Sequence, residues 1–555
     1  MKRVVVTGIG VVSCLGNNQD EVYKSLLNAK SGITFSEEYK EYNLKSHVHG
    51  KPNIKLEDHV DRKFIRFMGP GSAYNYISMA EAVKKFLAKY PISELEQGDV
   101  LLTNDPWDGT GHLNDFTVVT PVFLSSEIIG FFASTSHIAD VGGRGFGPDA
   151  NDLFEEGLRV PISFLLEKGK PNKTLMELIK ANVRDPLVAE GDLYSLIACN
   201  EAGSVELLEM LNDLDLRNLE ELGKIILDRY KNAMREEIER LGHHDVQYEM
   251  VIDGYEEPVL IRCRMVIDQG FVDLDFSGSS SASPKGINVP FPYSVAYASF
   301  GVRCLIGNEI PNNSGSLSLI RVSAPESSLL NAKFPRAVSA RHSIGQMLPD
   351  VVIGCFHQVT PDKVPCEGAS CIWNPVFMNG IEAATGTVKI DRFVINPIFN
   401  GGTGARPRKD GMSTTAFPSG VRTTSTEVNE ATSPLIFWKK EFRPNSGGKG
   451  RFRGGLGQTI EISHRYGSDF VMSKMFDRII HPARGRDGGD AGEPGRVSYV
   501  SQEGEVTELP GKGRDVIPAG CRLVMDTPGG GGLGSSESRS KAMLQLDRVN
   551  GLVDD

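Results

Sequence analysis

Residues 112–140 read HLNDFTVVTPVFLSSEIIGFFASTSHIAD, and this stretch guides the interpretation of the whole chain. Two apolar runs, residues 116–123 and 128–133, are separated by the short segment Leu-Ser-Ser-Glu. Apolar runs of this length on either side of a short polar turn predict a β-hairpin. With the turn centred near Ser125 and Ser126, paired residues should have numbers that sum to about 251.

A His-x-x-Asp pattern occurs at both ends of this stretch, as His112 with Asp115 and as His137 with Asp140. The predicted pairing places Asp115 beside Ser136, so both patterns should meet at the open end of the hairpin. Two imidazoles with one or two carboxylates are the donors from which a protein builds a divalent-metal site. The alternative is that Asp115 or Asp140 only stabilises a turn.

The composition is typical of a soluble globular protein, with 24% charged and 40% hydrophobic residues. A length of 555 residues suggests three or four domains. The net charge of −11 argues against nucleic acid as the main partner. No apolar stretch approaches the roughly 20 residues of a membrane span, and the N-terminus lacks a secretory signal. The eight cysteines are scattered without a Cys-x-x-Cys pair, which favours reduced thiols and a cytoplasmic location.

Beyond the hairpin, the sequence alternates between helical and strand patterns. Apolar residues recur at three- and four-residue steps over 216–241, which predicts one long helix with a core-facing side. Residues 246–276 change to a period of two and predict a second hairpin. Sixty glycines gather in clusters such as 142–147, 401–404, 447–457 and 529–532, which predicts many tight connections. We therefore expect an α+β (mixed) fold.

The first 78 residues form a separate segment. The stretches MKRVVVTGIGVVS (1–13), GNN (16–18), SGITF (31–35), DRK (61–63) and RFM (66–68) resemble the start of a β-ketoacyl-acyl-carrier-protein synthase. The nucleophilic cysteine of that family has no counterpart here, because Cys199 lies in a different context. The resemblance therefore implies an incomplete, non-catalytic thiolase-like fragment fused to the rest of the chain.

The remaining residues, 79–555, carry another set of motifs. The main ones are GDVLLTNDPW (98–107), GHLND (111–115), HIADVGG (137–143), EGLRVP (156–161), DFSGS (275–279) and the glycine-rich block at 446–457. These residues resemble the hydantoinase B, 5-oxoprolinase and acetone carboxylase α-subunit group. The resemblance implies a large multi-sheet fold, which we divide into a metal-hairpin and helical region (79–245) and a β-rich region (246–555).

The resemblance also implies site residues. His112, Asp115 and His137 match metal ligands of the group, with manganese as the expected cation and zinc or iron as alternatives. Asp140 would be a fourth ligand or would orient His137 through a hydrogen bond. Asp105, before Pro106, would be a catalytic base, although an aspartate that forms a turn explains it equally well.

The implied function is that of a metal-dependent subunit of an ATP-driven cyclic amidase, of the N-methylhydantoinase or 5-oxoprolinase type. A hydantoinase A-like partner would bind ATP and phosphorylate a small cyclic amide or ketone, and this chain has no Walker-type phosphate-binding motif of its own. The alternatives are the α-type subunit of an acetone or acetophenone carboxylase and a non-catalytic scaffold for the partner. Further polar candidates are Arg336, Arg341, Glu427 and Glu430.

Overall fold

The computed structural model describes residues 82–109, 111–379, 393–421 and 423–554, together with two short strands near the N-terminus. These strands, β1 (Thr34–Phe35) and β2 (Val48–His49), pair antiparallel. The chain divides into two compact units, Met1–Pro70 and Gly71–Asp555. Apart from β1 and β2, the thiolase-like fragment predicted for residues 1–78 lies outside the described residues.

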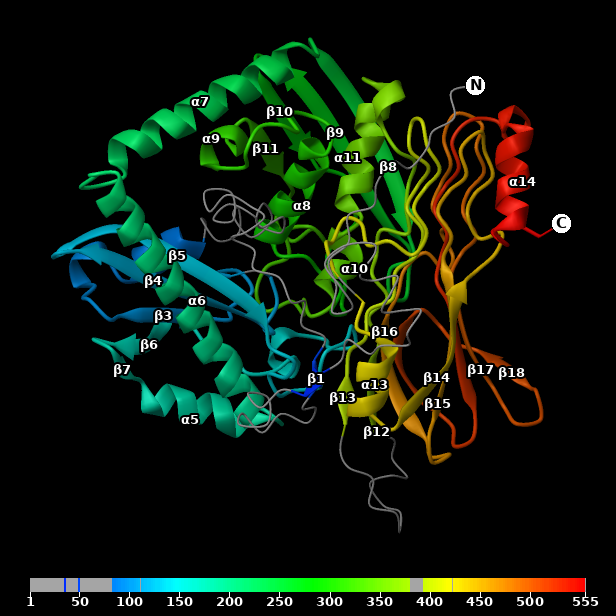
Figure 1. Ribbon diagram of the computed structural model, residues 1–555, viewed down its shortest axis with the longest axis horizontal. Helices are drawn as coiled ribbons and strands as arrows, with labels where there is room; N and C mark the ends of the chain where they lie inside the picture. Colours follow the sequence, from blue (N-terminus) through cyan, green and yellow to red (C-terminus); the bar gives the residue numbers. More distant parts are fainter. Residues whose placement is uncertain are drawn as a thin grey trace. The chain divides into compact units, whose positions relative to one another are not determined.

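The larger unit combines helices and sheets, as the sequence predicted, and its first sheet contains the predicted hairpin (Figure 1). The strands of this sheet are β3 (Val100–Thr103), β4 (Asp115–Leu124), β5 (Glu127–His137), β6 (Ser163–Glu167) and β7 (Lys170–Pro171), in the spatial order β5-β4-β3-β6-β7. Helix α6 (Pro186–Asp213) packs on β4 and β5, and α5 (Lys173–Asn182) packs on α6. The Asn200 amide in α6 donates to the Val118 carbonyl of β4 at 3.2 Å, which ties the helix to the sheet.

The hairpin leaves the predicted register at a β-bulge. Pairing next to the turn is as predicted, but Ile129 is an extra residue in β5 and shifts the rest of the ladder by one position. Asp115 therefore pairs with His137, and the predicted pairing with Ser136 is wrong. Because directly opposite residues of an antiparallel pair point to the same face, the bulge places the Asp115 and His137 side chains on one side of the sheet.

The second sheet confirms the hairpin predicted for residues 246–276. Its strands are β8 (His244–Ile252), β9 (Val259–Asp268), β10 (Phe271–Asp275) and β11 (Ile320–Ser323), in the order β11-β10-β9-β8. The alternating apolar side chains of β9 and β10, such as Ile261, Met265 and Leu274, are buried. Helix α11 (Leu348–His357) packs against β8, β9 and α8 (Phe291–Arg303), so this face forms part of a large core.

The long helix predicted over residues 216–241 is the shorter α7 (Glu220–Glu239), which contacts the short helix α9 (Ser314–Leu317). Only the C-terminal half of its apolar face reaches the core, where Met234 and Ile238 are fully buried. Ile225 is 58% exposed. The expectation of a core-facing side along the whole helix is therefore wrong for its first half, because periodicity defines a face but not what covers it.

Two further sheets form the C-terminal part. One contains β12 (Val376–Asn379), β13 (Val394–Ile395), β16 (Phe470–Met475) and β19 (Lys512–Ile517), in the order β13-β12-β16-β19. The other contains β14 (Leu435–Phe442), β15 (Gln458–His464), β17 (Arg496–Val500), β18 (Val506–Glu508) and β20 (Arg522–Asp526), in the order β14-β15-β20-β17-β18. The short helices α10 (Arg341–Gly345) and α13 (Thr426–Thr432) and the terminal α14 (Lys541–Val549) complete the fold. Trp373 stacks on Phe476 at 4.3 Å within this core.

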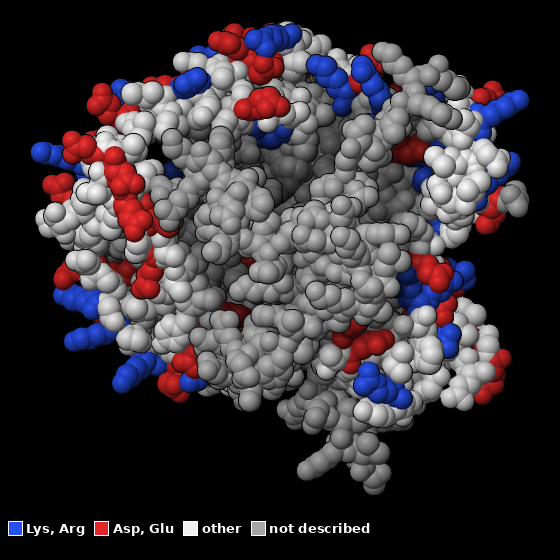
Figure 2. Space-filling model, viewed as in Figure 1, with Lys and Arg blue, Asp and Glu red and all other residues white. Residues whose placement is uncertain are grey.

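The surface carries both signs of charge. On the face drawn in Figure 2, the described Lys and Arg side chains are interspersed with Asp and Glu and form no continuous basic area. This agrees with the net charge of −11. Among the described residues, no helix combines the length and the apolar character needed to cross a membrane.

Candidate metal centre

The open end of the β4–β5 hairpin brings the three predicted metal ligands together. One potential ligand atom from each of His112, Asp115 and His137 lies within 4.8 Å of the others. His112 Nδ1 is 3.0 Å from Asp115 Oδ2, and His137 Nδ1 is 3.6 Å from Asp115 Oδ1. The centres of the two imidazole rings are 5.0 Å apart. Each carboxylate oxygen of Asp115 therefore faces one of the two histidines.

A tight loop before β4 positions His112. Gly111 has a φ of +107°, and a Cβ atom there would lie 2.7 Å from Arg341 Nε. Only glycine adopts this backbone conformation readily and also leaves space for the arginine. The Asn104 amide donates to the Leu113 carbonyl at 2.8 Å and so holds the following turn of the chain. This loop carries the GHLND motif identified in the sequence.

The electrostatics of the centre suit a cation. Burial lowers the pKa of His112 to about 4, and Arg341 acts in the same direction. His112 is therefore neutral at pH 7, which is the form that binds a metal. Burial acts to raise the pKa of Asp115, but the neighbouring His112 and Arg341 hold it well below its usual range. Neither group needs to release a proton before it binds a cation at neutral pH.

The donor set also fits a metal geometrically. His112 Nδ1 is buried and, within the described part of the chain, makes no well-aligned hydrogen bond, although the Asp115 carboxylate is 3.0 Å away. Buried polar atoms are almost always satisfied by a partner, and a bound cation between these groups would supply one. Two imidazoles and a carboxylate suit manganese, iron or zinc, and three protein ligands leave coordination positions open. The side chain of His137 is 43% exposed, so solvent reaches the centre from that side.

Arg341, one of the polar candidates from the sequence, lies at this centre. Its Nη2 atom is 2.5 Å from Asp115 Oδ2, and its guanidinium lies 4.5 Å from the ring centre of Tyr293. The side chain is buried and begins α10. Arg341 therefore connects the hairpin to a helix more than 200 positions later in the chain.

Two residues of the centre were not identified from the sequence. The Phe146 ring lies 5.6 Å from the His112 ring and 5.2 Å from the His137 ring, and it stacks on His342 at 5.8 Å. Burial lowers the pKa of His342 to about 3, and its Nε2 lies 3.0 Å from Asn374 Oδ1. The available signals were the glycine cluster around Phe146 and the position of His342 next to Arg341, but neither predicts a contact with the hairpin.

Asp105 and Asp140, the other two aspartates predicted at the site, make other contacts. Asp105 is buried, its Oδ2 lies 2.5 Å from Arg159, and its Oδ1 accepts the Trp107 N–H at 3.0 Å. Asp140 accepts the Gly142 N–H at 3.2 Å and pairs with Arg184. Neither belongs to the group of three ligands. Both contacts fix loops on the flanks of the hairpin.

The remaining polar candidates lie elsewhere in the described part of the chain. Arg336 and Glu427 are exposed, and Glu427 lies in the first turn of α13. Glu430 accepts the Phe437 N–H at 2.8 Å, which connects α13 to β14. These contacts give Glu430 a local structural role.

Family models match most of the chain. The model described as hydantoinase B/oxoprolinase matches residues 68–536. A second model, described as beta-ketoacyl synthase, N-terminal domain, matches residues 1–97. That second match is minor and falls mostly outside the described residues.

Several curated proteins are similar over nearly the same range. An uncharacterized protein of Methanocaldococcus jannaschii is 31% identical over 480 residues, covering 85% of this chain and 82% of the relative. The putative B component of a D-/L-hydantoinase from a Pseudomonas species is 27% identical and covers 82% of this chain and 79% of the relative. The 5-oxoprolinase 1 of Arabidopsis thaliana is 28% identical over 80% of this chain, but the chain spans only 36% of that protein's length.

Two solved structures share the fold. The ATP-dependent caprolactamase from Pseudomonas jessenii aligns with a TM-score of 0.78 and 22% identity, covering 87% of this chain and 85% of that chain. The nucleotide-free structure of acetone carboxylase aligns with a TM-score of 0.74 and 16% identity, covering 87% and 71%. The predicted fold class is confirmed by both alignments.

Proposed function

The chain belongs to the hydantoinase B/oxoprolinase family, and on this premise we propose that it is the metal-dependent subunit of an ATP-driven cyclic amidase. The observation that carries the proposal is the convergence of His112, Asp115 and His137 at the open end of one hairpin. When bound there, a divalent cation such as manganese, zinc or iron supplies Lewis acidity toward a carbonyl oxygen or toward water. This chemistry suits the opening of an activated amide.

The residues around the centre have distinct proposed roles. Neutral His112 and ionised Asp115 hold the cation, and exposed His137 completes the set on the open side. Arg341 keeps Asp115 ionised and in place. Asp140, through its contacts with Gly142 and Arg184, acts as a positioning residue for the loop that follows the hairpin. The base role predicted for Asp105 stays a prediction, since its carboxylate pairs with Arg159.

The partner in this proposal is an ATP-binding subunit. One relative is named as the B component of a hydantoinase, which implies a second component in that system. The present chain carries no Walker-type motif. We propose that a hydantoinase A-like protein phosphorylates a small cyclic amide and that this chain completes the ring opening.

A carboxylase role is the second candidate, because the same donor set could polarise the carbonyl of a ketone. The two activities differ in their need for bicarbonate. ATP-dependent turnover of hydantoin or 5-oxoproline without bicarbonate supports the amidase, whereas turnover of acetone that requires bicarbonate supports the carboxylase. If the chain were only a scaffold for the partner, neither activity would depend on His112, Asp115 or His137.

The test is to measure metal content and ATP-dependent amidase activity of the chain with its partner, in the wild type and in Asp115→Asn, His112→Ala and His137→Ala. Asp115→Asn keeps the size of the side chain but removes the charge, so we expect metal affinity to fall by roughly tenfold or more and activity to fall with it. His243→Ala is the matched control, because His243 is an exposed histidine outside the centre. Full metal content and full activity in both histidine variants would overturn the proposal.

A further inference from the structure

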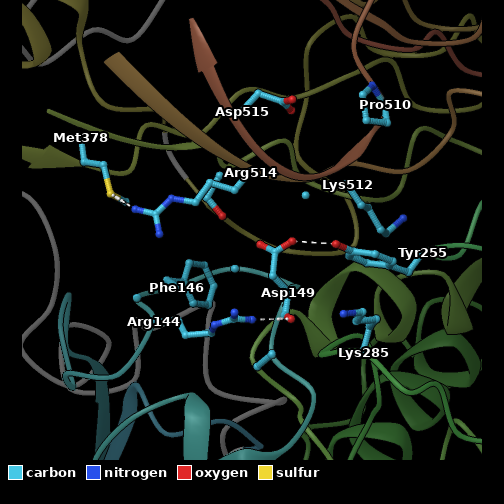
Figure 3. Close-up of a pocket in the computed structure, with 15 residues that line it drawn as sticks. Arg144, Phe146, Asp149, Tyr255, Lys285, Met378, Pro510, Lys512, Arg514 and Asp515 are labelled. Carbon is cyan, nitrogen blue, oxygen red and sulfur yellow. Dashed lines mark hydrogen bonds between the residues drawn. The ribbon is translucent and has the colours of Figure 1, made fainter. Parts of the chain in front are cut away.

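Phe146 is shared by the candidate metal centre and a neighbouring cavity of about 500 Å³. Its ring lies 5.6 Å from the His112 ring and 5.2 Å from the His137 ring, edge to face with both. Phe146 also lines the cavity, and neither histidine is among the described residues of that lining. Figure 3 shows Phe146 in the lining, with Asp149 of the same loop and Arg514 of β19. One aromatic side chain therefore forms the wall between the two spaces.

The position of this wall is fixed by packing. The Phe146 ring stacks on His342 at 5.8 Å, and His342 Nε2 lies 3.0 Å from Asn374 Oδ1. The next residue is Gly147, where a Cβ atom would clash with the Ser473 side chain, so the loop lies directly against β16. Phe146 is itself buried and belongs to the large hydrophobic core. The ring is thus held in place on several sides.

The cavity behind the wall collects positive charge in a chain whose net charge is −11. Four cations line it, namely Arg144, Lys285, Lys512 and Arg514, against two acids, Asp149 and Asp515. The acids have partners: the Tyr255 hydroxyl donates to Asp149 at 2.6 Å, and the buried Lys474 pairs with Asp515. The lining is therefore cationic in excess.

Two of the four cations are available to an anion. Within the described residues, Lys285 and Arg514 have no carboxylate partner. The lysine donates to the Asn151 amide oxygen at 3.0 Å, and the arginine contacts the Met378 sulfur at 2.7 Å. The other two cations are already paired with carboxylates. A carboxylate that entered the cavity could therefore form charge-assisted hydrogen bonds with Lys285 and Arg514.

We propose that Phe146 is a specificity-determining residue, which limits the size of the substituents that an amide ring can carry at the metal centre. The inference rests on the proposed function and deepens it: unsubstituted rings are accepted, and bulky side groups are excluded because the ring of Phe146 occupies their path. Removal of this ring joins the cavity to the centre. The cations of the cavity then favour a substituent that carries a carboxylate over a neutral one of similar size.

The first test is the ratio of kcat/KM for 5-benzylhydantoin to kcat/KM for hydantoin, measured with the ATP-binding partner. We expect this ratio to rise at least roughly tenfold in Phe146→Ala and by a smaller factor in Phe146→Leu, because each substitution opens part of the wall. Phe154→Ala is the matched control, since Phe154 is 70% exposed and lies outside the cavity lining. Metal content should not change, because Phe146 supplies no ligand atom.

The second test compares 5-benzylhydantoin with 5-(4-carboxybenzyl)hydantoin, which differs from it by one carboxylate. In Phe146→Ala, we expect the carboxylated compound to be preferred by roughly tenfold, and we expect this preference to disappear when Arg514→Gln is added. Addition of Arg264→Gln is the control, because Arg264 is exposed on β9 and paired with Asp245. Absence of the preference in Phe146→Ala would overturn the joining of the cavity to the centre.

Titration calorimetry of the metal-loaded chain with the ring-opened product of each hydantoin gives a measurement that needs no turnover. Equal ratios of kcat/KM and of product affinity in the wild type, Phe146→Ala and Phe146→Leu would overturn the role of Phe146 and leave the metal-centre proposal intact. A raised affinity ratio in the variants without ATP-dependent turnover in any sample would support the role of Phe146 and overturn the proposed function. Failure of every product to bind would overturn both. Thermal unfolding shows whether each variant is folded, and Phe146→Leu decides if Phe146→Ala is not.

Discussion

Asp115 is the residue that the other groups of the metal centre share. Its Oδ2 faces both His112 and Arg341, and its Oδ1 faces His137. Because its pKa is held well below the usual range, this carboxylate stays ionised at neutral pH and is a poor proton acceptor. In the proposed function, Asp115 therefore anchors the cation, and any proton transfer involves another group.

Glu156 supports the same centre indirectly, by binding the backbone of the segment that precedes Arg341. Its Oε1 accepts the backbone N–H groups of Val338 and Ser339 at 2.7 Å each, and these residues precede Arg341. Its Oε2 is buried and, in the described part of the chain, has no hydrogen-bond partner. Burial raises the pKa of Glu156 to about 8. The side chain is therefore largely protonated at neutral pH while it holds the segment that delivers Arg341.

The Glu156→Gln variant tests this protonation state. A carboxyl whose folded pKa is raised stabilises the fold fully below its unfolded pKa of 4.5 and loses that contribution as the pH rises through about 8. We expect the wild type to lose stability relative to the variant over this window, by up to about 1.4 kcal/mol per pH unit. Urea unfolding at several pH values measures the difference.

Glu505→Gln, at an exposed position, is the control for this measurement. Its free energy of unfolding should differ from that of the wild type by nearly the same amount at each pH. Parallel stability profiles of the wild type and Glu156→Gln between pH 5 and 8 would show that Glu156 is ionised throughout. In that case an ionised carboxylate would accept the two N–H groups that hold the segment before Arg341.

The sequence identified the residues of the centre that lie close together in the chain, and it did not assign the distant residues to the centre. His112, Asp115 and His137 come from one hairpin, so a local pairing argument could bring them together. Arg341 was only one of several polar candidates, and His342 was not identified. Arg341 contacts Asp115 across 226 positions of the chain, and His342 reaches the centre by stacking on Phe146 across about 200 positions. No short-range pattern encodes such a contact.

At the scale of elements, the β4–β5 hairpin was predictable, but its bulge was not. Apolar runs and a short turn define a hairpin, and pairing next to the turn followed the prediction. The extra residue Ile129 depends on how the strands twist and pack in the complete sheet. The bulge shapes the candidate metal centre, since only the shifted register places Asp115 opposite His137.

Deletions of one and of two residues at the bulge test the importance of this register. Removal of Ile129 alone takes out the bulge but lets Gly130 follow Ile128 directly, so Asp115 should still pair with His137. Removal of both Ile129 and Gly130 shifts the ladder by one further position, so Asp115 and His137 should point to opposite faces. We expect metal binding to be retained in the single deletion and to fall by at least roughly tenfold in the double deletion, as for a lost ligand. Equal metal content in the two variants would show that metal binding does not depend on this register.

At the scale of the whole molecule, the glycine clusters pack against one another. The sequence predicted tight connections at 401–404, 447–457 and 529–532, and the structure brings these segments into direct backbone contact. The Gly448 N–H donates to the Gly530 carbonyl at 2.9 Å, and the Gly455 N–H donates to the Thr403 carbonyl at 2.8 Å. Composition indicated glycine-rich connections, but the stacking of three distant clusters is a property of the complete fold.

The last prediction concerns this glycine layer. A Cβ atom at Gly454 would lie 1.8 Å from the Gly530 carbonyl oxygen, and all its near neighbours are backbone atoms that cannot rotate away. We expect Gly454→Ala to destabilise the fold by about 3 kcal/mol or more. At Gly223, within α7, a Cβ atom would meet nothing within 4 Å. Gly223→Ala should therefore stabilise the helix by about 0.5–1 kcal/mol. Denaturant unfolding compares the two variants, and equal stability would contradict close packing of the clusters.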